Sequence, residues 1–76
     1  MNPDRPSSGL PPSRGRVVEF DAHIGLGRIV MSDGRLLMFH CAEIADGSRM
    51  IEIDTEVAFE IRTKFAREEA GLVTPI

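Results

Sequence analysis

Few residues of this chain have the types and spacing that catalysis requires. His40 and Cys41 are adjacent, so in an extended segment their side chains point to opposite faces and cannot act as a nucleophile–base pair. The glycines of Gly25-Leu26-Gly27 lack the third glycine of a dinucleotide fingerprint, and no helical pattern follows them. The other histidine, His23, has no chelating spacing to the nearby carboxylates. We therefore expect no enzyme, no metal site and no cofactor.

Length, cysteine content and charge narrow the class of protein further. A chain of 76 residues has room for one small domain with a modest core. A single cysteine excludes an internal disulfide and favours a reducing cytoplasm, and no apolar run resembles a signal peptide or approaches the roughly 20 residues of a membrane span. From Gly15 onward, seven basic residues face eleven acidic ones, a net charge of −4. We expect a cytoplasmic protein with no membrane partner and no basic field to attract phosphates.

The chain divides into two parts by composition. Residues 1–14 contain four prolines and three serines but a single large apolar residue, Leu10, so burial cannot offset the entropy of ordering them. We expect residues 1–14 to form a disordered tail and residues 15–76 to form one domain.

Short apolar runs separated by turns indicate that residues 15–76 are all-β. Asp33-Gly34 lies between two apolar runs, which is typical of a hairpin turn, and apolar residues alternate with other residues over 57–62. Residues 64–70 have helical propensity and precede Gly71, so we expect a loop with one helical turn there. The remaining runs predict five strands in a small barrel or sandwich, at residues 17–20, 26–30, 36–41, 57–62 and 72–74.

The order of motifs across residues 15–76 resembles that of a bacterial cold-shock domain. The family's two ribonucleoprotein motifs usually have the sequences Gly-Phe-Gly-Phe-Ile and Val-Phe-Val-His-Phe. Six matching features occur here in the family's order: Gly15-x-Val17-x-x-Phe20-Asp21, Gly25-Leu26-Gly27-Arg28-Ile29, Leu37-Met38-Phe39-His40-Cys41, Ile44, Val57–Ile61 and Ala70–Val73. The resemblance implies a five-stranded antiparallel barrel of the oligonucleotide/oligosaccharide-binding (OB) type, with single-stranded nucleic acid bound by stacking on exposed rings.

The departures from the family pattern fall on one face. Strand alternation separates the side chains of each motif into two faces, and the positions that correspond to the core remain apolar: Ile29, Leu37, Phe39, Ile44, Val57, Phe59, Ile61 and Val73. Most positions where the family has rings or a basic residue hold other side chains: Glu19, Ile24, Leu26, Arg28, Met38, Cys41 and, in the next loop, Ser48. Strand alternation places Leu26, Arg28 and Met38 on the face opposite the core. Phe20, His40 and the basic character of Arg16 are retained.

This pattern leads to two functional hypotheses. The resemblance implies a site for single-stranded RNA or DNA that binds weakly and with little sequence specificity, formed by Arg16, Phe20, Leu26, Arg28, Met38 and His40. The alternative is a protein-interaction or homodimer interface that reuses the Leu26 and Met38 face, because an exposed apolar patch with a charged rim is typical of such interfaces. Individual candidate residues can also have a purely structural role, since a phenylalanine in so small a domain often packs in the core.

Overall fold

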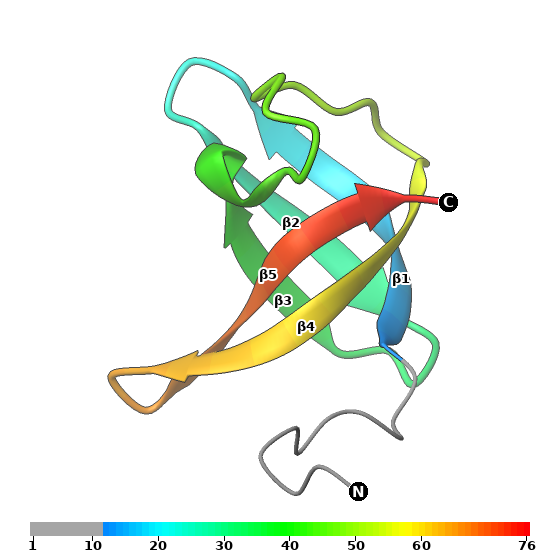
Figure 1. The fold of residues 1–76 in the computed structure, drawn as a ribbon. Helices are drawn as coiled ribbons and strands as arrows, with labels where there is room; N and C mark the ends of the chain where they lie inside the picture. Colours follow the sequence, from blue (N-terminus) through cyan, green and yellow to red (C-terminus); the bar gives the residue numbers. More distant parts are fainter. Residues whose placement is uncertain (1–11) are drawn as a thin grey trace, which may run out of the picture.

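The protein is a closed barrel of five strands (Figure 1). The computed structural model describes residues 12–76, with Lys64 described by its backbone alone. The elements are β1 (Ser13–Asp21), β2 (Leu26–Met31), β3 (Leu36–His40), the short 3₁₀ helix η1 (Cys41–Glu43), β4 (Glu56–Lys64) and β5 (Arg67–Pro75). The prediction of a small five-stranded OB-type barrel is confirmed.

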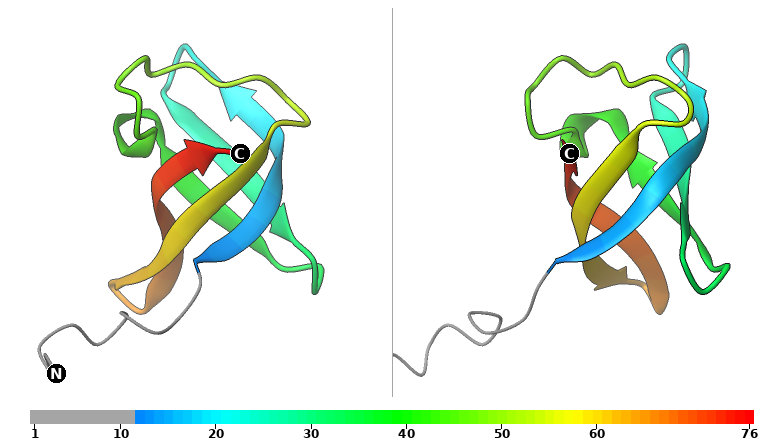
Figure 2. Two further views of the ribbon diagram at one scale, coloured as in Figure 1. Left: turned by 45° about the vertical axis from the view of Figure 1, so that its right-hand side comes forward. Right: turned by 90° about the vertical axis from the view of Figure 1, so that its right-hand side faces the viewer.

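The strands close in the order β1-β2-β3-β5-β4, and they cross obliquely around the interior, as both views in Figure 2 show. The β1–β2, β2–β3, β4–β5 and β1–β4 pairs are antiparallel. The pair that completes the barrel, β3–β5, is parallel, with Met38 opposite Glu69. A parallel bridge between Ile44 and Val73 extends this closure beyond β3. The expectation of a purely antiparallel barrel is therefore wrong at this one pair.

The first strand begins earlier than the sequence indicates. Ser13 and Arg14, which composition assigns to the tail, pair with Phe59 and Ala58 of β4. This pairing gives the backbone groups of both residues hydrogen-bond partners and so orders them. The polar composition of the segment does not indicate such pairing. The predicted disorder of the tail concerns mainly residues 1–11, which lie outside the described residues.

Two local expectations are wrong. Residues 64–70 form the tip of the β4–β5 hairpin and the start of β5, not a loop with a helical turn. Seven residues with helical propensity cannot sustain a helix alone, and pairing across the hairpin satisfies their backbone groups instead. Cys41, placed at the end of the third strand by its apolar run, is the first residue of η1.

The core follows the period-two pattern of the strands. Seven of the eight predicted core residues are buried, while Ile61 is half-buried against the others. Val17 and Ala70 complete the core, whose largest fully buried side chains are Phe39 and Phe59. Burial of each such side chain stabilises the fold by about 1.5–3 kcal/mol. Within residues 12–76 no helix is both long and apolar enough to cross a membrane.

Candidate nucleic-acid interface

Strands β1, β2 and β3 present one continuous surface to solvent, which we call the outer face. Their register arranges its side chains in three cross-strand rows: Asp21–Leu26–His40, Glu19–Arg28–Met38 and Arg16–Val30–Leu36. A bulge at Val18 adds one residue to β1, so that Arg16 and Glu19 both face outward although three positions separate them. The intervening residues of β2 and β3, Ile29, Leu37 and Phe39 among them, point into the core.

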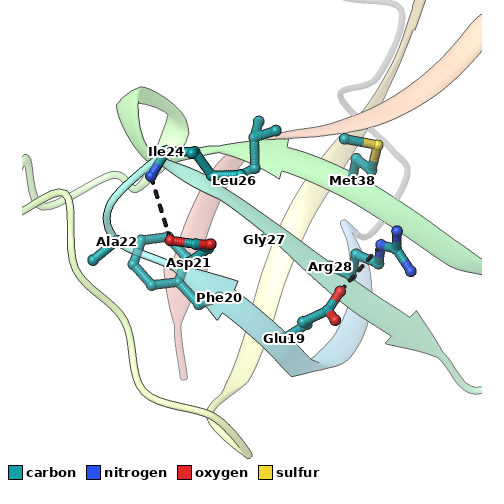
Figure 3. A pocket seen from close by; sticks show the side chains of 9 residues that line it. All are labelled: Glu19, Phe20, Asp21, Ala22, Ile24, Leu26, Gly27, Arg28 and Met38. Carbon is teal, nitrogen blue, oxygen red and sulfur yellow. Dashed lines mark hydrogen bonds and ion pairs between the residues drawn. The ribbon is translucent and has the colours of Figure 1, made fainter.

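The upper part of the outer face is hollowed into an open pocket of about 490 Å³ (Figure 3). Figure 3 shows Leu26 and Met38 on one side of Gly27, with Phe20 and Glu19 from β1 on the other. Four of the six predicted site residues line this pocket, namely Phe20, Leu26, Arg28 and Met38. The structure therefore brings together, from three strands, residues that are up to 18 positions apart in the chain.

Phe20 serves the core and the pocket at once. It is half-buried, and its ring lies parallel to that of Phe39, with an interplanar angle of 10° and a centroid separation of 6.0 Å. Gly27, opposite Phe20 in the register, has room for no side chain, because a Cβ there would lie 2.4 Å from Phe39 Cζ. Phe20 thus forms a wall of the pocket and packs against the core ring of Phe39.

Arg28 is already engaged by a carboxylate. Its Nε lies 3.2 Å from Glu19 Oε1, and the two side chains are 53% and 63% exposed. Exposed ion pairs of this kind contribute at most about 1 kcal/mol, so the pair is easily opened. It nevertheless places a negative charge beside Arg28, the one cation among the described residues that line the pocket.

Asp21 adds a second carboxylate to the pocket and shapes its loop. Asp21 Oδ1 accepts hydrogen bonds from the backbone N–H of His23 at 2.9 Å and of Ile24 at 3.4 Å. The turn is completed by Gly25 in the left-handed region, with φ of 76°. This loop holds Ile24 over the pocket with 61% of its surface exposed. One arginine and two carboxylates make the local charge balance of the pocket negative.

The other two predicted site residues lie outside the pocket. His40 is exposed at the end of β3, directly opposite Leu26, and thus adjoins the pocket. Arg16 lies farther along β1, where its Nη2 is 2.9 Å from Glu56 Oε2 and its Nη1 donates to the carbonyl of Asp54 at 3.2 Å. Arg16 lines a separate hollow of about 380 Å³ near the C-terminus.

Two features of the site escaped the sequence reasoning. The Glu19–Arg28 ion pair follows from the β1–β2 register, which the bulge at Val18 makes difficult to count from sequence. The apolar surface is also larger than the Leu26 and Met38 pair, because Val30 and Leu36 continue it as the adjacent row, with Leu36 55% exposed. Strand parity alone would have placed both residues on the outer face. Among the described residues, no group of three or more His, Cys, Asp or Glu side chains gathers as a metal site would.

Comparison with known proteins identifies the fold. No protein-family model matches the chain, and no curated protein matches it. Solved structures do match, among them the cold-shock-domain structure of Drosophila Unr (CSD456), with a TM-score of 0.75 and 25% sequence identity. That match covers 100% of this chain and 31% of the Unr chain, so this chain spans less than a third of the matched protein. The barrel is a cold-shock-type OB fold.

Proposed function

We propose that the domain binds single-stranded RNA or DNA on its outer face, weakly and with little sequence specificity. One observation carries this proposal: Phe20, Leu26, Arg28 and Met38 converge on one pocket, which is formed mainly by β1, β2 and the loop between them, with Met38 contributed by β3. The corresponding surface is the one through which OB folds bind oligonucleotides. The Unr neighbour is built of cold-shock domains, a nucleic-acid-binding and non-enzymatic kind of domain.

Each side chain in the pocket suits a different part of a nucleotide. The Arg28 guanidinium can stack on a base or contact a phosphate once it leaves Glu19. Phe20, opposite Gly27, and His40, opposite Leu26, offer flat rings, while Leu26 and Met38 offer apolar surface without ring geometry. Contacts to bases through such surfaces discriminate poorly between sequences.

The same surface explains why binding is weak. Stacking contributes about 1–3 kcal/mol per base, and five or six of the family's ring positions hold residues without rings. Glu19 and Asp21 also place negative charge where a phosphate backbone would approach. We expect dissociation constants in the high micromolar to millimolar range, which corresponds to only about 4–6 kcal/mol of binding free energy.

The test is a titration of labelled oligo-dT and oligo-U at low and high salt. We expect weak, salt-sensitive binding that the double variant Arg28→Glu, His40→Ala abolishes. Arg14→Glu is the matched control, since it makes the same charge change on β1 outside the pocket. Equal affinity of the double variant and the unaltered protein would show that the outer face is not the site.

A second candidate, a homodimer or protein partner held through the Leu26 and Met38 face, is supported by the exposed apolar side chains around it. Ile24 and Leu36 are 61% and 55% exposed and lie at opposite ends of a stripe that includes Val30. A contiguous apolar patch of this kind is typical of an interface. Concentration-dependent sedimentation that Leu36→Asp abolishes, together with no oligonucleotide binding, would favour this function over the first.

Two further predictions from sequence accompany the proposal. We propose a non-enzymatic role, consistent with the cold-shock-type fold, and a cytoplasmic location, consistent with the single cysteine.

A further inference from the structure

The most exposed ring of the protein lies outside the pocket. The chain has four phenylalanines and no tryptophan or tyrosine. Phe39 and Phe59 are buried and Phe20 is half-buried, whereas Phe65 is 100% exposed. Phe65 lies at the tip of the β4–β5 hairpin, which protrudes at the opposite end of the barrel from the β1–β2 loop (Figure 1). A solvated aromatic side chain at a protruding tip makes no contribution to the core.

The backbone at this tip is strained. Phe65 and Ala66 both have positive φ, at 50° and 63°, and Lys64 pairs with Arg67 on either side. Two consecutive positive φ values define the tight hairpin turn that strongly prefers Asn-Gly. A phenylalanine and an alanine are poor choices for that turn on conformational grounds, and strain of this kind concentrates at functional sites.

Arg67, two residues after Phe65, has no carboxylate partner among the residues that the structure describes. Arg16, Arg28, Arg35 and Arg62 all form ion pairs, whereas no ion pair within the described part of the chain involves Arg67. The nearest acidic residue along the chain, Glu68, is 3.1 Å from Arg35 Nη1. That pairing compensates the charge of Glu68, and the turn itself, Lys64-Phe65-Ala66-Arg67, carries two basic residues and no acidic one.

We propose that the β4–β5 hairpin tip is a second contact point for single-stranded nucleic acid. Phe65 stacks on one base, and Arg67 contacts the adjoining phosphate. A ring flanked by cations is the combination that sequence-tolerant binders of single strands use. The inference rests on the ligand class proposed above, but it does not depend on the pocket being occupied.

The position of the hairpin allows one strand of nucleic acid to reach both contacts. Glu69 pairs with Met38 at the edge of the pocket, and Phe65 lies four residues before Glu69. At about 3.3 Å per residue along a strand, the tip is roughly 13 Å from the Met38 row. An oligonucleotide that crosses the outer face toward β5 therefore meets the hairpin next.

The lack of tryptophan and tyrosine makes the test direct. Phe65→Trp places a single fluorophore at the tip, and Ile76→Trp places a matched fluorophore at the C-terminus, where the side chain is 61% exposed. On titration with oligo-dT we expect quenching of the Phe65→Trp emission, as a stacked base produces, and little change for Ile76→Trp. Quenching of both variants to the same extent would overturn the proposal.

Affinity measurements separate this inference from the proposed function. We expect Phe65→Ala to weaken oligo-dT binding about fivefold or more, the lower limit for one stacked base. Arg67→Glu should weaken it further, while Arg67→Lys should retain most of it. If Phe65→Ala binds as tightly as the unaltered protein while Arg28→Glu does not, the hairpin contact is wrong and the outer-face function stands. If the unaltered protein binds no oligonucleotide and anionic vesicles shift the emission of Phe65→Trp, the tip contacts lipid and the proposal is likewise overturned.

Discussion

Glu19 is the residue that most limits the outer face as a nucleic-acid surface. It occupies the position at which the cold-shock family has an exposed ring, and its carboxylate engages Arg28 at 3.2 Å. A glutamate at this position offers no stacking surface, adds a negative charge and pairs with the nearest cation, Arg28.

Replacing Glu19 by glutamine should therefore raise affinity for oligo-dT. The change removes repulsion toward phosphate and frees Arg28, and together these effects should contribute about 1 kcal/mol, or roughly fivefold in affinity, at low salt. Anisotropy titrations at two salt concentrations measure it, with Glu52→Gln as the control for the charge change. An affinity that is unchanged or lower would mean that Arg28 does not contact the ligand.

Gly27 shows how the pocket depends on a single missing side chain. A Cβ at this position would lie 2.4 Å from Phe39 Cζ and 2.9 Å from the carbonyl oxygen of Glu19. Gly27→Ala should cost about 1–3 kcal/mol of unfolding free energy through overpacking, measured by urea denaturation. Gly34→Ala, where no atom lies within 4 Å of an added Cβ but φ is +91°, separates the cost of crowding from that of backbone strain. Equal stability of Gly27→Ala and the unaltered protein would show that Phe39 and Phe20 repack freely.

At the scale of elements, the β4–β5 hairpin is where local sequence and structure disagree. The turn has both central residues in the left-handed region without an asparagine or a glycine. Replacing Phe65-Ala66 by Asn-Gly should stabilise the domain by about 1–2 kcal/mol, and each kcal/mol raises Tm by about 4–8 °C in a domain of this size. A thermal melt gives the stability and an oligo-dT titration gives the binding, which should weaken as stability rises. A lower Tm would contradict the assignment of strain to this turn.

The β2–β3 turn carries a pH-dependent contribution to stability. A hydrogen bond from the backbone N–H of Arg35 to Asp33 Oδ1, at 3.0 Å, and the Arg35 side chain hold the pKa of Asp33 below its ordinary value of 3.8. Because the pKa is lower in the folded state than in the unfolded chain, this stabilisation is complete above the ordinary value and is lost as pH falls through the folded value. The urea concentration at half-unfolding should therefore decrease less for Asp33→Asn than for the unaltered protein when the pH is lowered from neutral to below 3.8. If the decrease in the urea midpoint is the same for both proteins, the acid sensitivity comes from other carboxylates.

Sequence patterns predicted the barrel well because its core obeys simple alternation. Ile29, Leu37 and Phe39 are buried where the period-two pattern places them. The order of the motifs along the chain was sufficient to predict the five-stranded barrel. The start of β1 was mispredicted because its pairing with the distant strand β4 overrides local composition. The β4–β5 hairpin was mispredicted because pairing across the turn overrides the helical propensity of residues 64–70. The pocket was predicted in part, since parity places side chains on a face but does not reveal which of them pair with each other or with core rings.

At the scale of the whole molecule, the domain has a cold-shock-type barrel but lacks rings at most positions where the cold-shock family has them. A barrel of about 65 residues is only marginally stable, so its core tolerates little change, while solvent-facing positions are free to diverge. Arg28 is 53% exposed, and Leu26 and Met38 are half-buried at the pocket wall. Substitutions at these positions alter the surface without entering the core.

The most direct test of this account is to restore the rings with the triple variant Leu26→Phe, Arg28→Phe, Met38→Phe. We expect oligo-dT affinity to rise by up to roughly 1–3 kcal/mol for each new ring, with a smaller net gain at position 28 because a cation is lost there. Stability should change little, and the sedimentation coefficient should equal that of the unaltered protein. Unchanged affinity together with a disrupted oligomer would contradict the account and identify the outer face as a protein interface.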